Sequence, residues 1–495
     1  MTSQAVCSAA MSSPRHQALE AVILADPEDP AGYLVYGDHL QSVADPRGEL
    51  IAVQAARTAD AASTELRAAE LALLEAHRAA WFGADAPLPH VHVDWFHGFW
   101  RSLDVGSLGH IPGPPLDGQV AQLVASPSAR FVRELHCRGP FTARVLELAE
   151  PLAATLRVLE VAVHPHGSFV DDDLLALAPL TRLRRLHLFS CEPITCEGVA
   201  VLGNLRELAE LDLRNCRLTD AIAHELVHLP LSDVSFNAVA PTFTADGMRA
   251  LATAPLRRLA LELTDRNTEG ASDALVAPLA AHPTLVNLEL DAAQLTATGM
   301  RTLGGISRLR RLVLASSGLA GRDVAMLTSL AGGLESLHLG HSSGVTDAAC
   351  DALAGFERLA FLDVGATAIA GAGLRSLARI RSLVHLDLSF LALEDADIAV
   401  LADLPELRSL SLAYTRLTDR AIDTLVQLPR LEKLDLSSTK ITPAAIDRLA
   451  ELPALIELGL SDCESDTIER AYQRPQWYVG ARELIELHDE LDDVR

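Results

Sequence analysis

The chain has 495 residues, a formal net charge of −25 at pH 7 and only two lysines, at positions 433 and 440. So large an acidic excess argues against nucleic acid and anionic membranes as partners, because binding to either depends on Lys and Arg side chains that neutralise phosphates. A basic or neutral protein is the kind of partner that this charge favours.

The cysteines and the apolar segments predict a cellular location. Seven cysteines, at positions 7, 137, 191, 196, 216, 350 and 463, are odd in number and include no C-x-x-C pair, which indicates a reducing compartment. The first residues lack a charged start followed by a long apolar run, so we expect no signal peptide. No apolar run reaches the length of about 18 residues that a membrane-spanning helix needs. We therefore expect a cytoplasmic monomer that does not bind membranes.

The first part of the chain predicts a disordered end and a small helical domain. Residues 1–13 are small and polar, and we expect them to be disordered. A first helix begins at Pro14 and ends at Asp26, because a residue that precedes proline avoids the helical conformation. Three further helices are predicted over residues 30–42, 47–57 and 61–81. Together the four helices form the predicted domain 14–82.

Within this domain, the segment LEAVILADPEDPAGYLVYGDHLQSVADPRGELIAVQ resembles the bacterial repeat-companion domain. The matching positions are Asp26-Pro27, Asp29, Leu34-Val35-Tyr36, Asp38, Leu40 and Asp45-Pro46-Arg47-Gly48-Glu49. Gly37 and His39 depart from the family, which usually has Ala and Trp there. The resemblance implies no biochemical activity. Asp45 and Pro46 explain the Asp-Pro-Arg-Gly segment as a turn into the third helix, with a partner-binding role as the alternative.

Residues 83–99 are predicted to link this domain to the rest of the chain. Alternating apolar and polar residues from His90 to Trp95 are typical of an edge strand that caps a sheet and turns its imidazoles outward. His90, His92 and Asp94 are a conceivable metal site, but two histidines two residues apart on a strand are more often surface residues. We therefore expect no metal here.

From Trp100 one pattern repeats, most regularly between Leu383 and Leu460, at intervals of 24 residues. Each copy reads L-x-x-L-x-L, then a polar turn, then I/L-x-x-L-x-x-L. The first half has the period of two of a strand buried on one side, and the second half has the three-and-four spacing of a helix. No copy can bury its apolar face alone, so the copies must stack. Fifteen copies fall within residues 100–463.

These copies resemble the leucine-rich-repeat family, and the L-T-D or I-T-P before the helices is most similar to its cysteine-containing and ribonuclease-inhibitor-like classes. The resemblance implies an α/β fold, namely a right-handed solenoid with a concave parallel sheet and convex helices, after a small N-terminal helical domain. Threonines predict the helix N-caps, at positions 219, 346, 418 and 442. Residues 464–495 break the repeat and predict a C-terminal capping helix with an acidic tail.

One segment matches an enzyme motif. His224-Glu225-Leu226-Val227-His228 fits H-E-x-x-H, in which two histidines one helical turn apart bind zinc. The repeat register assigns His224 and His228 to solvent-facing positions of a convex helix, where neither a cleft nor a third ligand is expected. Cys191, Cys216 and Cys463 share a register position that Thr fills in other copies, which predicts buried small side chains. We therefore predict no catalytic residue, no metal and no cofactor.

The solvent-facing positions of the sheet predict where a partner binds. In most copies they are small or charged, but the four copies that begin at residues 334, 359, 383 and 407 differ. Their residues are His338, His341, Phe361, Asp363, His385, Asp387, Phe390 and Tyr414. Phe390 and Tyr414 hold the same position in adjacent copies, so their rings should lie about one strand spacing apart. Exposed aromatics among charges are typical of interfaces, although a solvated surface is the alternative.

The sequence as a whole predicts a non-enzymatic scaffold that binds a protein partner on the concave face of the solenoid. A second interpretation is an adaptor or substrate receptor that recruits an enzyme through the N-terminal helical domain. A third and remote interpretation is a zinc hydrolase that acts through His224 and His228.

Overall fold

A computed structural model describes residues 13–82, 90–106, 116–163, 167–263, 272–474 and 477–480. The chain divides into two compact units, Met1–Arg217 with His224–Phe236, and Leu218–Ala223 with Asn237–Arg495. Residues 1–12, which the sequence predicts to be disordered, and residues 481–495 of the predicted capping helix lie outside the described residues.

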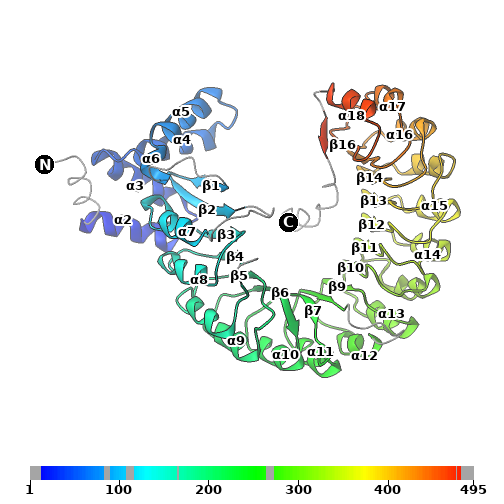
Figure 1. The fold of residues 1–495 in the computed structure, drawn as a ribbon, viewed down its shortest axis with the longest axis horizontal. Coiled ribbons are helices and arrows are strands. Elements are labelled where there is room, and N and C mark those ends of the chain that lie inside the picture. Colours follow the sequence, from blue (N-terminus) through cyan, green and yellow to red (C-terminus); the bar gives the residue numbers. More distant parts are fainter. Residues whose placement is uncertain are drawn as a thin grey trace. The chain divides into compact units, whose positions relative to one another are not determined.

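Helices open the first unit, as predicted, and Figure 1 shows them beside the first two strands. They are α2 (Pro14–Ala25), α3 (Pro30–Ser42), α4 (Arg47–Ala59), α5 (Thr64–Ala76) and α6 (Arg78–Phe82). Proline at the first helical position starts α2 and α3, because its fixed φ suits the helix and its missing N–H is not needed there. The side chains of Ser13 and Asp29 complete these starts by accepting the N–H groups of His16 and Ala31 at 3.2 and 3.0 Å.

The prediction of one helix over residues 61–81 is wrong, since α5 ends at Ala76 and a separate helix, α6, follows. The N–H of His77 donates to Leu73 O and closes α5. The ring of Trp81 in α6 then lies 5.1 Å from that of Trp95, and Phe82 lies 5.1 Å from Trp100. The break therefore lets two large aromatic side chains pack on the first strands.

The helices and the first strands share one apolar core. Tyr33 and Tyr36 of α3 are 1% exposed and pack with Phe99 and Phe131, which are also 1% exposed. The Tyr36 ring stacks on Phe99 at 5.8 Å, and the Tyr33 ring meets Phe131 edge-on at 5.6 Å. The helices thus cover the end of the sheet. The limits 14–82 of the helical domain remain a prediction.

The Asp-Pro-Arg-Gly turn has a structural role in this unit. The Asp45 carboxylate accepts both the backbone N–H and the Nε–H of Arg47 at 2.9 Å, and the two side chains are about 5% exposed. A Cβ atom at Gly48 would lie 2.6 Å from Gln41 N and 2.7 Å from Gly37 O, so only glycine lets α3 and α4 approach this closely. Asp45 and Arg47 are therefore buried within the helical segment.

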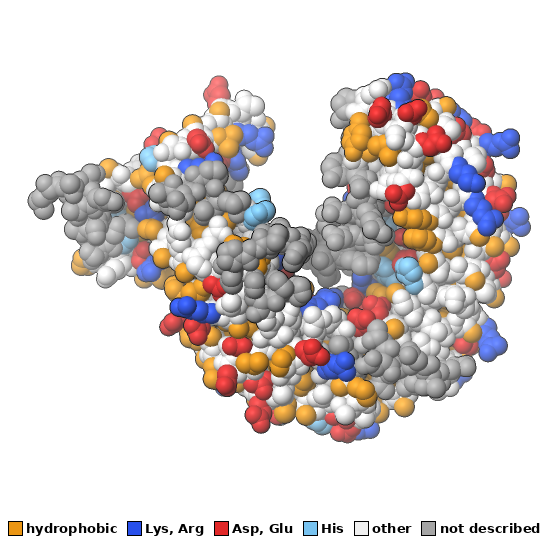
Figure 2. Space-filling view, in the orientation of Figure 1, with side chains coloured by type: hydrophobic (Ala, Val, Ile, Leu, Met, Phe, Trp, Pro, Cys, Tyr) orange, Lys and Arg blue, Asp and Glu red, His pale blue; other side chains and the backbone are white. Residues whose placement is uncertain are grey.

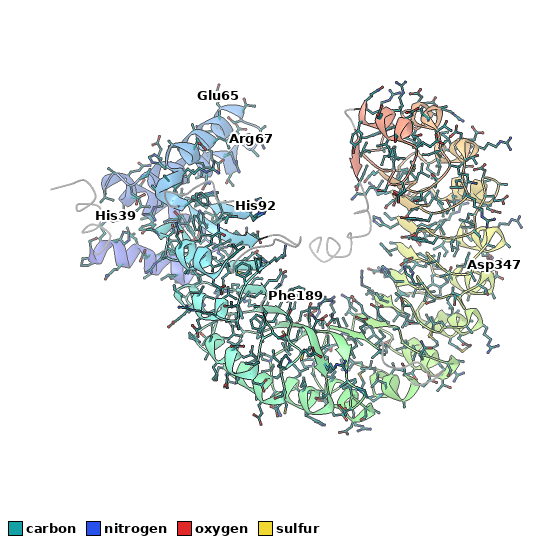
Figure 3. All side chains as sticks on the ribbon, in the orientation of Figure 1. His39, Glu65, Arg67, His92, Phe189 and Asp347 are labelled. Atoms are coloured by element: carbon teal, nitrogen blue, oxygen red, sulfur yellow. The ribbon has the colours of Figure 1, made fainter. Side chains whose placement is uncertain are left out.

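The strands of the first unit begin with an antiparallel pair. β1 (Val91–Phe96) pairs with β2 (Phe99–Gly106), and β2 to β6 then pair in parallel in the order of the sequence. The further elements of this unit are α7 (Asp117–Val124), η1 (Pro127–Ala129), β3 (Glu134–Arg138), α8 (Val145–Leu148), η2 (Glu150–Leu152), β4 (Val158–Ala162), η3 (Asp171–Leu177), β5 (Arg185–Phe189), α9 (Cys196–Val201), η4 (Leu202–Asn204) and β6 (Glu210–Leu218). β1 is the predicted capping strand, and His90, His92 and Asp94 are exposed on it or beside it, as expected. Figure 3 labels His92 on this strand.

The second unit continues the alternation of strands and helices. Helix α10 (Asp220–Leu226) and strand β7 (Asp233–Val239) follow β6, and each contains residues of both units. The following elements are α11 (Ala245–Leu251), β8 (Arg258–Glu262), α12 (Asp273–Val276), η5 (Ala277–Leu279), β9 (Asn287–Asp291), α13 (Ala297–Gly304), β10 (Arg311–Val313), η6 (Gly321–Leu330), β11 (Ser336–His338), α14 (Asp347–Leu353), β12 (Phe361–Asp363), α15 (Gly371–Leu377), β13 (His385–Asp387), η7 (Asp397–Asp403), β14 (Ser409–Ser411), η8 (Asp419–Ala421), α16 (Ile422–Leu425), β15 (Lys433–Asp435), α17 (Pro443–Leu449), β16 (Glu457–Gly459), α18 (Ser465–Tyr472) and β17 (Tyr478–Gly480).

Each predicted copy contributes one strand, from β2 to β16, and β8 to β17 pair in parallel in the order of the sequence. One buried leucine stands at the centre of each short strand from β10 to β16, in register with the next and at most 2% exposed. Helices α14 and α15 lie together on one side of these strands (Figure 1). The fold is an α/β leucine-rich-repeat solenoid with a helical region at its N-terminus.

Successive turns are joined by a ladder of side-chain hydrogen bonds that the sequence analysis missed. An aspartate at the start of one helical segment accepts the N–H and the hydroxyl of the threonine that caps the next helix. The pairs are Asp171–Thr195, Asp220–Thr244, Asp273–Thr296, Asp395–Thr418 and Asp419–Thr442. Asp347, on the helix side of its turn (Figure 3), accepts the N–H of Ala370, a residue that has no hydroxyl to donate. Of the predicted caps, 219, 418 and 442 accept helix N–H groups and 346 does not.

The C-terminal end differs from the prediction. Helix α18 ends at Tyr472, and the chain then forms β17, which pairs in parallel with β16 through Val479 and Leu458. The sheet is thus extended by a strand without the L-x-x-L-x-L pattern. None of the described helices combines the length and apolarity that crossing a membrane requires.

Candidate functional site

The strands β10 to β16 present two rows of side chains on the side of the sheet away from the buried leucines, which we call the sheet face. The first row runs Phe361, His385, Ser409, Lys433, Glu457 and the second His338, Asp363, Asp387, Ser411, Asp435, each residue in register with the next. Three residues after the second row comes a third, the strand-end row, with Ser316, His341, Ala366, Phe390, Tyr414, Ser438 and Asp462. The eight predicted site residues therefore fall in three neighbouring rows.

Every residue of the strand-end row has a left-handed backbone, with φ between 51° and 59°. A ladder of hydrogen bonds accompanies this conformation, since the N–H groups of the row from Ser316 to Ser438 each donate to a carbonyl of the following turn. His341 donates to Gly365 O, Phe390 to Ala413 O and Tyr414 to Ser437 O, all at 2.8 Å. For a bulky L-residue this conformation costs about 1–2 kcal/mol relative to the right-handed region.

Phe390 and Tyr414 stack on one another in this row. Their ring centroids are 4.2 Å apart and their planes are inclined by 8°, which confirms the predicted spacing of about one strand. Phe390 is 52% exposed and Tyr414 is 39% exposed. The Tyr414 hydroxyl donates to Asp462 Oδ2 at 3.4 Å, and the His341 ring lies 6.5 Å from that of Phe390, beyond Ala366. Hydrophobic and His side chains are accordingly visible near one another over this part of the sheet (Figure 2).

A second aromatic group occupies the first two rows. The ring of Phe361 stacks on that of His338 at 4.4 Å and on that of His385 at 5.8 Å. His338 is only 2% exposed, so the prediction that it faces solvent is wrong, and the reason is that Phe361 covers it. Burial lowers the pKa of His338 to about 3 and also lowers the pKa of His385. Both imidazoles are therefore neutral at physiological pH.

The aspartates of the second row are oriented by backbone groups. Asp363 Oδ1 accepts the N–H of Gly365 at 2.8 Å, and Asp387 Oδ1 accepts the N–H of Ser389 at 2.7 Å. Burial, assisted by the negative charge of Asp363, raises the pKa of Asp387 to about 6. The carboxylates of Asp363 and Asp387 thus lie on adjacent strands and repel each other, which favours the protonated form of Asp387.

This part of the sheet face carries an excess of negative charge. Among the residues that the structure describes, no Lys or Arg lies within ion-pair distance of Asp387, Asp435 or Asp462. Lys433 is already paired with Glu457 at 3.2 Å. A cation from another molecule would therefore meet carboxylates that lack a cationic neighbour within the described chain.

The sheet side of the first unit is different, because its charges are paired internally. Hydrogen bonds to Glu134 and Glu160 outweigh the effect of burial and raise the pKa of His136 to about 9. The Oε atoms of Glu160 accept from His136 at 3.0 Å and from Arg138 at 2.7 Å, and these bonds outweigh burial and lower the Glu160 pKa to about 2. His187 and Glu210 repeat the pairing at 2.9 Å.

The residues of the H-E-x-x-H motif do not share one helix. Helix α10 ends at Leu226, so His228 lies beyond its end, and both His224 and His228 are exposed. Within the described ranges, no group of three or more His, Cys, Asp or Glu residues is arranged to hold a metal ion. Cys191 and Cys216 are fully buried, as predicted from their register, and burial raises the pKa of both thiols. The prediction is wrong for Cys463, which is only partly buried in the last repeat.

Several features of the site were missed by the sequence analysis. Asp462 and Ser438 extend the strand-end row beyond Tyr414, and Ser389 packs closely against Gly365 beside Asp363. The signal was present, since aligning the position that follows each strand brings these residues into one column. Their importance was hidden because polar and small residues are unremarkable at any single turn.

Comparisons with known proteins add little to this description. No family model matches the chain, and no curated protein matches it. Among solved structures, an internalin from Listeria monocytogenes is similar with a TM-score of 0.38 and 20% identity, covering 72% of this chain and 86% of that one. Internalin C2 from the same species is similar with a TM-score of 0.33 and 22% identity, covering 45% of this chain and 88% of that one. The function is therefore argued from the residues of this chain.

Proposed function

We propose that this protein is a non-enzymatic scaffold that binds a protein partner on the sheet face of its second unit. The observation that carries the proposal is the exposed stack of Phe390 and Tyr414, whose rings stand among carboxylates in a costly left-handed conformation. Large aromatic side chains contribute most of the energy of many interfaces. A partner that covers this stack would remove both rings from water.

Finer parts of the same proposal follow from the sequence. We assign the repeats to the cysteine-containing, ribonuclease-inhibitor-like class and the first helices to a bacterial repeat-companion domain, in a monomer of the reducing cytoplasm that binds no nucleic acid. The six described cysteines are free thiols, which supports a reducing compartment. The buried Cys137 stands at a sheet position that other turns fill with leucine or valine, which supports a packing role for that thiol.

An adaptor that recruits an enzyme through the N-terminal helices is the second candidate, and one observation favours it. Val22 of α2 and Leu34 and Val35 of α3 are 56%, 44% and 57% exposed, although they are apolar. Replacing Val22 and Val35 by serine would remove this surface without touching the core residues of the same helices. Loss of a partner from this variant, with binding to the sheet face retained, would favour the adaptor.

The zinc hydrolase is the remote candidate. Metal analysis of the purified full-length protein tests it, because a site through His224 and His228 requires stoichiometric zinc. A variant with both histidines replaced by glutamine is the matched control, and zinc that persists in this variant does not belong to the motif.

The scaffold is tested by comparing partners that are captured from the native host. The wild-type chain, the double variant Phe390→Ala with Tyr414→Ala, and the control Tyr472→Ala are immobilised and their bound proteins quantified. Tyr472 is 67% exposed on α18, away from the strand-end row, so the control removes an exposed aromatic elsewhere. We expect the double variant to weaken binding of one partner by at least about 2 kcal/mol, with nearly unchanged melting, and the control to bind normally. Equal capture by all three proteins would contradict the proposed site.

A further inference from the structure

Three histidines are buried where the helices of the first unit meet its first strands. His16 of α2, His39 of α3 (Figure 3) and His97 of the turn between β1 and β2 are 2%, 7% and 5% exposed. Histidine is the side chain whose charge ordinarily changes between pH 5 and 8. The packing of this junction is therefore exposed to a change of charge under mildly acidic conditions.

The His16 ring belongs to a buried hydrogen-bonded group. Its Nε2 lies 2.9 Å from the Tyr36 hydroxyl and 3.4 Å from Glu20 Oε1, and the Tyr36 hydroxyl donates to the same carboxylate oxygen at 3.4 Å. The other oxygen, Glu20 Oε2, accepts from Arg130 Nη2 at 2.9 Å. Because the carboxylate already has this cationic partner, a neutral His16 ring completes the group without adding a charge.

The other two rings have nitrogen atoms that would be poorly placed as donors. The centroid of the His39 ring lies 5.6 Å from that of His16, and the His97 ring lies 5.7 Å from that of Tyr33. Within the ranges that the structure describes, His39 Nε2 and His97 Nδ1 are buried without a hydrogen-bond partner. Both nitrogens of a protonated imidazole are donors, so protonation of either ring would bury an N–H group without an acceptor.

The charges that face His16 add to this effect. The titratable and charged groups around it are Glu20 of α2, Tyr36 and His39 of α3, Asp45 and Arg47 at the start of α4, and Arg130 after η1. Burial lowers the pKa of His16, and the nearby His39 and Arg47 reinforce this effect against the opposing influence of Glu20. Burial also lowers the pKa of His97. The packed junction thus favours unprotonated rings.

We propose that His16, His39 and His97, together the histidine cluster, make the docking of α2 and α3 on the first strands of this unit sensitive to acid. A histidine whose pKa is lowered by docking contributes its full stability above about pH 6.5, the ordinary pKa of the side chain. As the pH falls below this value, the undocked helices take up protons that the docked form excludes, and the equilibrium shifts toward undocking. The device lies within the first unit and does not depend on the proposed binding face.

Hydrogen–deuterium exchange of the full-length protein tests the proposal. Exchange is measured at about pH 7.5 and about pH 5.5 and corrected for the intrinsic effect of pH on amide exchange. We expect the protection of peptides from residues 14–42 to fall by about tenfold for each histidine that docking keeps unprotonated, since the lower pH is about one unit below the ordinary pKa. Peptides from β3 and β4 are the internal control, because His136, with a pKa of about 9, and Glu160, with a pKa of about 2, keep their charges at both pH values.

Substitutions identify the rings that are responsible. His39→Gln removes a ring whose Nε2 makes no hydrogen bond within the described chain, and it should reduce the loss of protection at the lower pH. The double variant His16→Gln with His39→Gln should reduce this loss further. His92→Gln is the matched control, because it replaces an exposed histidine of β1 and should show the same loss as the wild type.

Two results would overturn the proposal. One is equal protection of residues 14–42 at both pH values in the wild type. The other is an undiminished loss in the double variant, because the protons would then bind to other groups. If the double variant does not fold, His39→Gln decides alone, since it leaves the contacts of His16 with Tyr36 and Glu20 in place: a reduced loss supports the histidine cluster and an undiminished loss contradicts it.

Discussion

Asp171 connects two turns of the first unit, and its removal would measure what one rung of the aspartate–threonine ladder contributes. Its carboxylate accepts the N–H of Thr195 at 2.8 Å and the Thr195 hydroxyl at 2.7 Å. Hydrogen bonds to a charged group contribute about 1.5–3 kcal/mol when shielded from water, but these two are exposed, so we expect about 2 kcal/mol in total from Asp171→Ala. The neighbouring exposed Asp172 offers the matched control, Asp172→Ala, which should cost little.

Gly198 makes the prediction more specific. A Cβ atom at Gly198 would lie 2.2 Å from Asp171 Oδ1 and 2.9 Å from its Cγ, so Gly198→Ala should destabilise the wild type by about 1–3 kcal/mol. In the Asp171→Ala background both of these contacts disappear, and the higher helix propensity of alanine, about 1 kcal/mol, opposes the loss. The double variant should therefore be more stable than the sum of the single changes predicts.

The assay must report local stability, because a solenoid can lose a few turns while the rest stays folded. Hydrogen–deuterium exchange of peptides from residues 167–205 gives this information, and urea denaturation followed by circular dichroism gives the global value. Strictly additive effects of Asp171→Ala and Gly198→Ala would refute the claim that the glycine is needed because of the aspartate.

Three further outcomes are expected. Leu434→Asp places a charge at a position that is 0% exposed and should unfold several turns, so an unchanged thermal melt would show that the repeat register is wrong. Asp387→Asn should stabilise the free protein by about 1–2 kcal/mol above pH 6, because the folded-state pKa of about 6 exceeds the unfolded value, and the gain should vanish below about pH 4 in denaturant titrations. His136→Gln should cost about 1–2 kcal/mol at pH 6, where His136 is protonated and Glu160 ionised, and progressively less as the pH rises through 9, so a pH-independent cost would count against the ion pair.

Much of the fold could be predicted because the same pattern of buried apolar residues occurs in fifteen copies. A leucine that is buried between neighbouring strands has to recur at the same register, and this periodicity located strands β2 to β16. The proline and threonine starts of the helices are local signals of the same kind. The division between α5 and α6, and the strand β17, depend on contacts of Trp81 and Val479 with residues far away in the sequence, and no local pattern announces them.

The site was predictable in part for the same reason. The register alone placed Phe390 and Tyr414 one above the other, because both follow strands of equal length. It did not reveal that Phe361 would cover His338, since alternation tells which side of a sheet a residue faces but not what its neighbour covers. The close packing at Gly365 was also hidden, because the oxygens of Asp387 and Ser389 that a Cβ atom there would meet come from the next turn.

The strand-end row separates what the fold requires from what a partner could use. The left-handed conformation recurs at small residues of the row such as Ser316 and Ala366 as well as at Phe390 and Tyr414, so it belongs to the repeat and not to a binding site. What distinguishes the two aromatic residues is that their stacked rings remain 52% and 39% exposed. Burial against another molecule would add about 25 cal/mol for each Å² of ring surface removed from water, which is the contribution that the free protein lacks.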